Sequence, residues 1–237
     1  MRERMHGSGK TAFFLNPNAP EEMTASMQQA LSPFNGAGMS FRCITSHAGL
    51  AIIQSRRDVD LCVPRMLALA DSVMQDALGF VAAYVSDPGL RSLREMTKLL
   101  VVRLLEASVC FAMSLGNRLG IIAMARPSVV RQRRSIAAAQ ISGRWAGRRP
   151  LHPSPGAYSD FEAKFPAMVE TGRALRDIDG ADRLVLGCSG VAGRRGRLEE
   201  MLNVPVVDPV EAAASLLLGQ LLESRSAASR RTVSPVV

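Results

Sequence analysis

The stretch "LVLGCSG", residues 184–190, runs from three apolar residues directly into glycine, cysteine, serine and glycine. A short apolar run that ends at turn-forming residues is typical of a buried strand that reaches the edge of a sheet. In α/β proteins, ligands bind at the carboxyl ends of such strands. Cys188 therefore lies where a reactive thiol is expected, although a free cysteine is also a common small core residue. The stretch alone leaves both interpretations open.

The rest of the chain repeats this alternation of short apolar runs and helical patterns. Strands are expected at residues 11–17, 40–46, 79–85, 99–104, 119–125, 148–152, 182–188 and 204–209. Helices are expected at residues 20–31, 58–76, 89–96, 106–116, 127–142, 160–178, 194–202 and 210–224. Strands separated by helices predict parallel sheets that are covered by helices on both faces.

Composition limits the class of protein. The chain has 237 residues, of which 47% are hydrophobic and 21% are charged, as in ordinary globular proteins. This length suits one large α/β domain or two small lobes. No apolar stretch reaches the roughly 18 residues of a membrane helix. The basic start is not followed by the apolar core of a secretory signal, so we expect a soluble, cytoplasmic protein.

Cysteine and histidine usage argues against a metal site. The chain has four cysteines and three histidines, and neither a Cys-x-x-Cys pair nor a Cys/His cluster occurs. A zinc site built from spaced pairs is therefore not expected. A disulfide framework is not expected either in a chain this long and this poor in cysteine.

Arginine dominates the formal net charge of +8, with seven arginines between residues 126 and 149. Such a segment suits either a nucleic-acid surface or a solvated helix face. Only Trp145 interleaves with these arginines, which leaves little for base stacking, so we expect no nucleic-acid partner. "GSGKT" (7–11) resembles the end of a phosphate loop, but the position of the first glycine is Arg4 and no strand precedes it.

Two short motifs stand at expected strand ends. "SDPGL" (86–90) has the residues of a tight turn, and its following helix could also aim N–H groups at an anion. In "GCSG" (187–190), Gly187 allows a close backbone approach and Gly190 frees the next turn. Cys188 would then lie near the start of the following helix, where the helix dipole favours a thiolate.

Taken together, these segments resemble a known family. "LNPNAPEEMTASM", "AAYVSDPGLRSLRE", "LEASVCFAMSLGNRLGIIA" and "VLGCSGVAG…LNVPVVDPVEAA" occur in the order and spacing of the aspartate/glutamate/hydantoin racemase family, nearest its hydantoin and allantoin racemase branch. The resemblance spans about residues 12–223. It implies two pseudo-symmetric α/β lobes, each a mainly parallel sheet flanked by helices, with the active site in the cleft between them. The expected boundaries are 11–104 plus 207–224 for one lobe and 105–206 for the other, with disordered tails at 1–10 and 225–237.

The resemblance also implies a chemistry. Two cysteines on opposite sides of a substrate carbon exchange its proton without a metal, pyridoxal or another cofactor. Cys188 matches the second cysteine, and Ser189 and Gly190 match the neighbours that donate hydrogen bonds to a carboxylate or imide oxygen. Asn16 matches the asparagine of the N-terminal binding loop, and Ser86 is a further expected oxygen-binding group. The expected partners are a small-molecule substrate and other copies of the chain, with no membrane.

The sequence departs from the family pattern at the first cysteine, which is Tyr84 here. A family threonine is Ala123, and a proline and a glycine are Leu100 and Arg103. Tyrosine titrates near pKa 10 and cysteine near 8.5, so a phenol is the poorer base at neutral pH. Tyr84 could be the second proton donor, or it could line a pocket and leave one thiol to act alone. We predict a racemase of hydantoin-type amino-acid derivatives with Cys188 as acid/base and Tyr84 opposite it. The alternatives are a one-thiol decarboxylase of malonate-type acids and an inactive ligand-binding protein.

Overall fold

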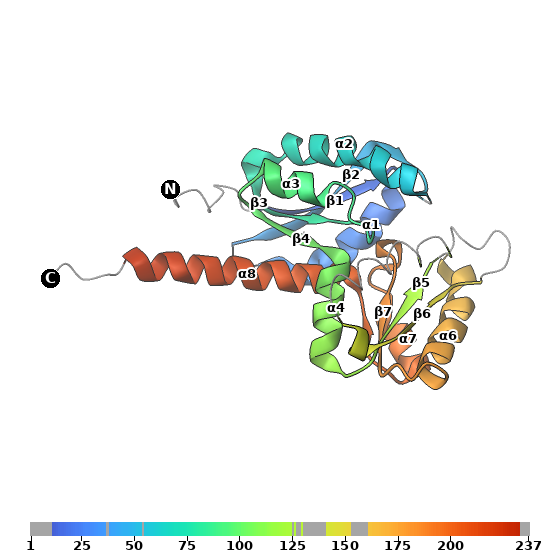
Figure 1. Cartoon of the computed structure of the whole chain (residues 1–237). Helices are drawn as coiled ribbons and strands as arrows, with labels where there is room; N and C mark the ends of the chain where they lie inside the picture. The colour runs from blue at the N-terminus through green and yellow to red at the C-terminus, as the bar shows by residue number, and fades with distance from the viewer. Residues whose placement is uncertain are drawn as a thin grey trace.

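The computed structural model contains two four-stranded parallel sheets with helices packed around them (Figure 1). The strand orders are β2-β1-β3-β4 and β6-β5-β7-β8, so the two sheets have the same winding. This arrangement confirms the predicted α/β class with two lobes. The structure describes residues 11–36, 38–53, 55–124, 126, 129, 141–152 and 161–232.

The elements follow the predicted alternation closely. The strands are β1 (Thr11–Asn18), β2 (Ser40–Leu50), β3 (Ala77–Ala82), β4 (Leu100–Arg103), β5 (Leu119–Ala123), β6 (Trp145–Pro150), β7 (Arg183–Leu186) and β8 (Val206–Val207). The helices are α1 (Glu21–Leu31), α2 (Arg56–Ser72), α3 (Leu90–Met96), α4 (Leu104–Leu115), α6 (Phe161–Asp177), α7 (Arg195–Leu202) and α8 (Pro209–Thr232). Short 3₁₀ turns are η1 (Ser32–Phe34), η2 (Met74–Asp76), η3 (Ser142–Arg144) and η4 (Ser189–Val191).

Side chains that alternate along β1 pack against helices on both faces of the first sheet. Phe13 and Leu15 belong to a buried cluster with residues of α2 and α3, whereas Ala12 and Phe14 join a cluster with residues of α1 and α8. Successive side chains of a strand point to opposite faces of the sheet, so one strand contributes to both clusters. Every residue of β1 after Thr11 is buried, as expected for a central parallel strand.

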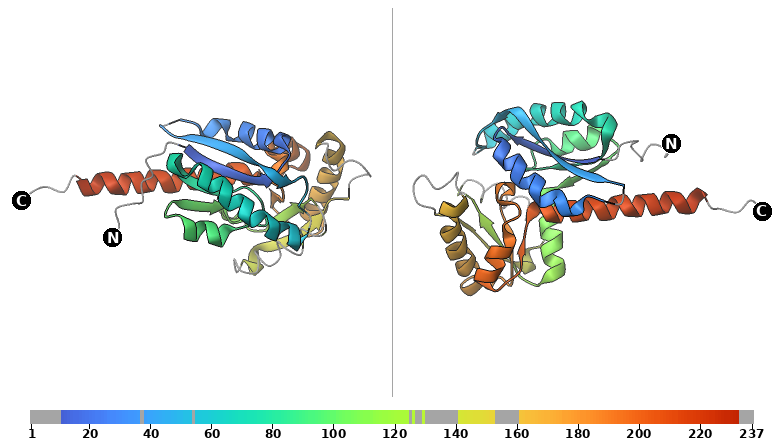
Figure 2. Two further views of the ribbon diagram at one scale, coloured as in Figure 1. Left: turned by 90° about the horizontal axis from the view of Figure 1, so that it is seen from above. Right: turned by 180° about the vertical axis from the view of Figure 1, so that it is seen from behind.

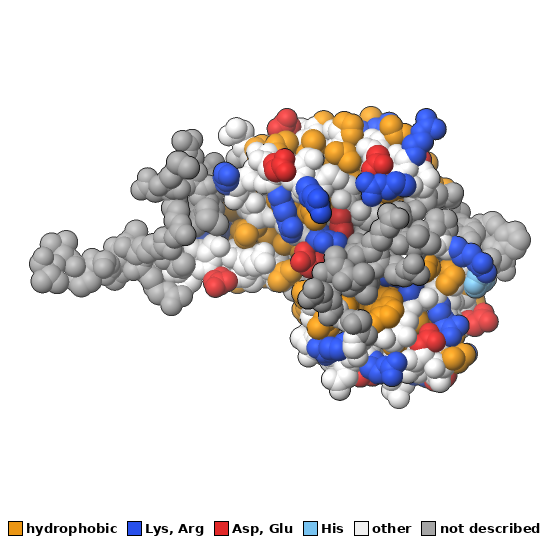
Figure 3. Space-filling model, in the orientation of Figure 1, with side chains coloured by type: hydrophobic (Ala, Val, Ile, Leu, Met, Phe, Trp, Pro, Cys, Tyr) orange, Lys and Arg blue, Asp and Glu red, His pale blue; other side chains and the backbone are white. Residues whose placement is uncertain are grey.

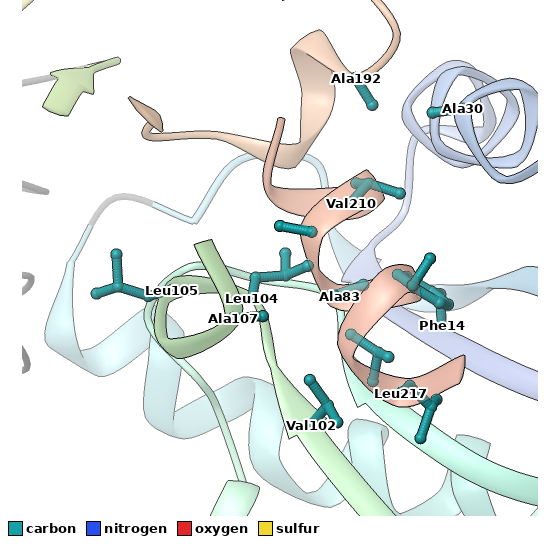
Figure 4. Packing of buried hydrophobic residues seen from close by; sticks show 14 of the residues in the cluster. Phe14, Ala30, Ala83, Val102, Leu104, Leu105, Ala107, Ala192, Val210 and Leu217 are labelled. Atoms are coloured by element: carbon teal, nitrogen blue, oxygen red, sulfur yellow. The ribbon is translucent and has the colours of Figure 1, made fainter. Parts of the chain in front are cut away.

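The two lobes share part of one hydrophobic core. The cluster on the α1/α8 face also contains Val185 and Val207 from the second sheet. In Figure 4, Ala192 and Ala30 point toward one another across the lobes, close to the start of α8 at Val210. Shared burial of this kind holds the carboxyl ends of the two sheets in a fixed relation.

Pro17 accounts for an irregularity at the end of β1. The register between β1 and β2 shifts between Asn16 and Asn18, because proline has no N–H to donate to the ladder. Pairing resumes beyond the shift, with Asn18 opposite Leu50. Strand β2 ends at Leu50 and is therefore longer than the strand expected at residues 40–46.

The last helix is also longer than expected. Helix α8 continues to Thr232 instead of ending at residue 224. Alanines and arginines in this stretch are good helix formers. Its C-terminal half extends away from the two sheets in each view (Figures 1 and 2). The expected tails at 1–10 and 233–237, and most of the helix expected at 127–142, lie outside the described residues.

Within the described part of the chain, none of the helices combines the length and the apolar character needed to cross a bilayer.

Candidate active site

Gly187 brings the chain from β7 to Cys188 by a close approach to β5. Its N–H donates to the carbonyl oxygen of Ile122 at 2.8 Å. A Cβ at this position would lie 2.6 Å from the same oxygen and 3.1 Å from Cα of Ala123, which no side chain tolerates without a shift. Cys188 follows with extended backbone (φ −155°, ψ 136°) and begins η4. Glycine at residue 187 thus lets the thiol emerge at the carboxyl end of the sheet.

The thiol of Cys188 is partly buried and takes a hydrogen bond from its own loop. Its Sγ accepts the N–H of Gly190 at 3.3 Å and packs beside the buried cluster of the second lobe. Burial raises the pKa of the Cys188 thiol, while the Gly190 N–H and the positive charge of Lys164 oppose that rise. Since burial prevails, the resting group at neutral pH is the protonated thiol.

Asp208 is a buried carboxylate that contributes to this electrostatic setting. It caps α8, with Oδ1 accepting the N–H of Val210 at 2.8 Å and Oδ2 accepting the N–H of Gly193 at 2.7 Å. Burial raises the pKa of Asp208 to about 6, so it is mostly ionised at neutral pH. Its negative charge adds to burial in raising the pKa of Cys188.

Ser189 joins the loop of residues 187–190, here called the thiol loop, to the first lobe. Its hydroxyl donates to the carbonyl oxygen of Ala83 at 3.2 Å, and its residue is only 2% exposed. Ala83 is itself held by β1, because its N–H donates to the carbonyl of Leu15 at 3.0 Å. Cys188 precedes Ser189 and Tyr84 follows Ala83 in the sequence, so this bond brings the backbones at the two predicted catalytic positions close together.

The side chain of Tyr84 is held by a segment that is distant from it in the sequence. Its hydroxyl donates to the carbonyl oxygen of Ile53 at 2.8 Å, and its ring packs against the buried cluster of Ile53, Val59 and Cys62. The phenol proton is therefore engaged by the segment that follows β2. Transfer of this proton to a bound substrate would require the hydroxyl to leave the carbonyl of Ile53 first.

Asn16 is buried and hydrogen-bonded within the first lobe. Its Oδ1 accepts the N–H of Asn18 at 3.0 Å, and its Nδ2 donates to Oγ1 of Thr24 at 2.9 Å. The hydroxyls of Thr24 and Thr45 are hydrogen-bonded at 2.5 Å. The side chain of Asn16 thus connects the end of β1 to α1, and this organises the binding loop predicted there.

Met23 is a residue of the site that the sequence did not single out. A Cβ placed on Gly190 would lie 3.1 Å from Cε of Met23 and 3.5 Å from Sγ of Cys188. The thioether of α1 therefore reaches the thiol loop from the opposite lobe. A methionine on an amphipathic helix is typical of a core residue, so its position beside the thiol required the tertiary structure.

The turn after Tyr84 is held by an ion pair. The N–H of Asp87 donates to the carbonyl of Tyr84 at 2.9 Å, and Asp87 has a left-handed backbone with φ 51°. Its carboxylate accepts from Nε of Arg103 at 3.0 Å. Ser86 is half-buried within the turn. The Asp-Pro-Gly motif predicted the turn, whereas nothing in the local sequence identified Arg103 as the partner of Asp87.

Three of the four described arginines of the 126–149 segment are engaged within the protein, whereas Arg126 is exposed. Arg144 donates to the backbone carbonyls of Met113 and Gly116, and Arg148 lies over the ring of Trp145 and donates to Val129. Arg149 forms a two-bond ion pair with Asp179. Figure 3 shows basic side chains scattered among acidic ones on the described part of that face. Arg131, Arg133 and Arg134 lie outside the described residues.

The geometry defines a class of site. Two parallel sheets of the same winding meet at their carboxyl ends, and one partly buried thiol stands there with a backbone N–H on its sulfur. Within the described ranges, no group of three or more histidine, cysteine or acidic side chains is placed to hold a metal ion. The class is that of two-lobed α/β proteins with a cysteine at the junction of the lobes.

Comparison with known proteins gives the family. The model of the Asp/Glu/Hydantoin racemase family matches residues 13–217, so the chain belongs to this family. The hydantoin racemase of Paenarthrobacter aurescens is 26% identical over 204 residues, which cover 84% of this chain and 86% of that protein. The solved allantoin racemase of Klebsiella pneumoniae superposes with a TM-score of 0.83 at 24% identity, over 90% of this chain and 88% of that one. An arylmalonate decarboxylase superposes with a TM-score of 0.62 at 19% identity, over 88% and 92% of the two chains. These two structural similarities are similarities of fold.

Proposed function

We propose that this protein is a cofactor-independent racemase of 5-substituted hydantoins or related amino-acid derivatives, with Cys188 as its acid/base group. The observation that carries the proposal is the position of Cys188. The thiol ends a central strand of one sheet, and Ser189 fastens its loop to the strand end that leads into Tyr84. The relatives named hydantoin racemase support the substrate class.

The proposed reaction moves one proton off the substrate carbon and another onto its opposite face. Cys188, which is protonated at rest, first gives its proton to solvent. The thiolate then takes the proton from the carbon next to the carbonyl, and the electron pair passes to the carbonyl oxygen as an enolate. The phenol of Tyr84 gives its proton to the other face of that carbon. This leaves Cys188 as the resting thiol, and the phenolate of Tyr84 takes a proton back from solvent. Tyr84 must leave the carbonyl of Ile53 to perform this step.

The contacts of Cys188 support this role. The raised pKa keeps the sulfur protonated at rest, so the group can also act as the donor in the reverse direction. The N–H of Gly190 stabilises negative charge on the sulfur when the thiolate forms. Lys164 acts in the same direction through its positive charge.

A substrate oxygen is proposed to bind at Ser86. The Ser189 hydroxyl already donates to the carbonyl of Ala83 and the Gly190 N–H to Sγ of Cys188, so we assign these two residues to holding the thiol in place. The buried amide of Asn16 already bonds Asn18 and Thr24, so we assign Asn16 to shaping the binding loop. Met23 would contact the substituent of the substrate beside the thiol.

A second candidate function is a one-thiol decarboxylase of malonate-type acids. The observation that favours it is the engaged hydroxyl of Tyr84, which leaves Cys188 as the one group ready to protonate an enolate, and on one face only. The structural similarity to arylmalonate decarboxylase agrees with this alternative at the level of fold.

The two candidates give different products. The purified protein is incubated in D₂O with single enantiomers of 5-benzylhydantoin and allantoin, and separately with a disubstituted malonate. A racemase erodes the optical rotation and exchanges the proton of the reacting carbon. A decarboxylase instead releases carbon dioxide and forms one enantiomer. A binding protein does neither, but a ligand raises its melting temperature.

The protein is further proposed to act in the cytoplasm as a homo-oligomer. All four of its cysteines are free, as expected in a reducing compartment. Phe111 and Leu115 on α4 and Leu222 on α8 are large exposed apolar residues that a second copy could cover. Light scattering of the purified protein measures the oligomeric state, and a monomer at micromolar concentration would contradict the proposal.

A further inference from the structure

The ion pair of Asp87 and Arg103 connects two neighbouring strand ends of the first lobe. Both Nε and a terminal guanidinium nitrogen of Arg103 lie on Oδ2 of Asp87, at 3.0 and 2.8 Å. Arg103 is the last residue of β4 and lies opposite Ala82, the last residue of β3. Its side chain is therefore placed to reach the turn that leaves β3, formed by residues 84–89.

This pair is less exposed than the ion pairs around it. The side chains of Asp87 and Arg103 are 8% and 23% exposed. Glu106 lies 3.9 Å from Arg103 and 3.8 Å from Arg94, and Glu106 and Arg94 are about half exposed. Exposed pairs at such distances contribute little, whereas loss of one partner from a buried pair leaves an uncompensated charge. Arg103 is therefore the neighbour that most favours the ionised form of Asp87, against burial, which raises the pKa of this carboxyl to about 7.

Few interactions other than the ion pair with Arg103 stabilise the conformation of Asp87. Its backbone is left-handed, a region that aspartate tolerates at some cost. Among the described residues, its Oδ1 is buried and has no hydrogen-bond partner. The side chain of Asp87 is thus held in place by Oδ2 and Arg103. The backbone of the turn keeps two further bonds, from Asp87 to Tyr84 and from Leu90 to Asp87.

We propose that Arg103 is a positioning residue for the candidate site: through Asp87 it fixes the turn of residues 84–89 and so the directions of Tyr84 and Ser86. The effect of the pair on catalysis rests on the proposed function. Its effect on the geometry of the turn does not.

The test compares Arg103→Gly, Arg103→Lys, Asp87→Asn and the double variant Arg103→Gly/Asp87→Asn. We expect Arg103→Gly to lower kcat for 5-benzylhydantoin between about ten- and a hundredfold with a smaller change in KM, because a displaced turn misplaces groups that act on the reacting carbon. Lysine restores part of the loss, because it keeps the charge but lacks the planar fork. The kcat of the double variant should not fall below that of the less active single variant, because the two single changes remove the same ion pair.

Amide hydrogen exchange at Asp87 and Leu90, measured by NMR, separates this inference from the proposed function. Both amides should exchange about tenfold faster in Arg103→Gly, because the open form of the turn gains population. Arg149→Gly is the matched control, because it removes a comparable ion pair with Asp179 in the second lobe. If Arg103→Gly leaves exchange at both amides unchanged, or lowers kcat no more than Arg149→Gly does, the inference is wrong. If the protein turns over no hydantoin, the proposed function fails and hydrogen exchange alone decides the inference.

Discussion

The hydroxyl of Ser189 donates a hydrogen bond to the carbonyl oxygen of Ala83, across 106 residues of sequence and between the two lobes. Both residues are buried. Since Cys188 and Tyr84 are their immediate neighbours, this bond sets how the two halves of the candidate site face each other.

Replacement of Ser189 by alanine should therefore affect both stability and rate. The carbonyl of Ala83 is left without this partner in a buried position, which costs about 1–3 kcal/mol of unfolding free energy. We expect kcat/KM to fall as well, because the thiol loop loses its connection to the first lobe. Ser215→Ala is the control, because it removes a hydroxyl that bonds the carbonyl of Glu211 within α8. Urea unfolding and initial rates are the measurements, and an unchanged kcat/KM would contradict the account.

Tyr84 can be tested by separating proton exchange from inversion. In Tyr84→Phe, Cys188 should still exchange the substrate proton for deuterium, while inversion falls by about a hundredfold for want of a second acid. Tyr84→Cys should raise inversion above that of the parent protein, because it places a thiol opposite Cys188. Polarimetry and NMR on one sample measure the two rates. Equal inversion by Tyr84→Phe and the parent protein would remove Tyr84 from the mechanism.

Gly187→Ala tests the close approach that delivers the thiol. The new Cβ meets backbone atoms of β5 that cannot move separately from the sheet, so we expect a loss of about 1–3 kcal/mol. Gly196→Ala in α7 is the matched control, where nothing lies within 4 Å of the new Cβ. That change should be neutral or stabilising by up to about 1 kcal/mol. Similar unfolding free energies for both variants would argue against the close approach.

Two buried carboxyls predict how stability depends on pH. Burial raises the pKa of Asp87 from 3.8 to about 7 and that of Asp208 from 3.8 to about 6. Between 3.8 and its raised pKa, each carboxyl holds more protons in the folded state than in the unfolded state. The free energy of unfolding therefore falls as pH rises through that range, by up to about 1.4 kcal/mol per pH unit for each group. Asp87→Asn should remove its part of the slope between about pH 4 and 7. Urea unfolding at several pH values measures this, and an unchanged slope would refute the assignment.

Local sequence patterns predicted the parts of the fold that depend on interactions between residues close in sequence. The apolar run before Gly187 and the turn residues at Asp-Pro-Gly placed the ends of β7 and β3 to within two and three residues, because both signals are contained in a few residues. The end of α8 was misplaced, because helix propensity continued beyond the apolar pattern.

The contacts within the candidate site could not be predicted from the sequence. Ser189 meets Ala83, Arg103 meets Asp87, and Met23 meets Gly190 only after the sheets have formed. The direction of the Tyr84 hydroxyl depends on Ile53, which lies 31 residues away along the chain. Residue type and spacing indicate which positions matter, whereas tertiary packing decides what each side chain touches.

The central claim is that the sulfur of Cys188 removes and returns a proton on a carbon acid. The most direct measurement is deuterium incorporation from D₂O at carbon 5 of 5-benzylhydantoin, followed by NMR after subtraction of the rate without protein. We expect Cys188→Ala to lower this rate by at least about a hundredfold, whereas Cys110→Ala, which removes an exposed thiol of α4, should leave it unchanged. Incorporation by Cys188→Ala at the rate of the parent protein would contradict the claim.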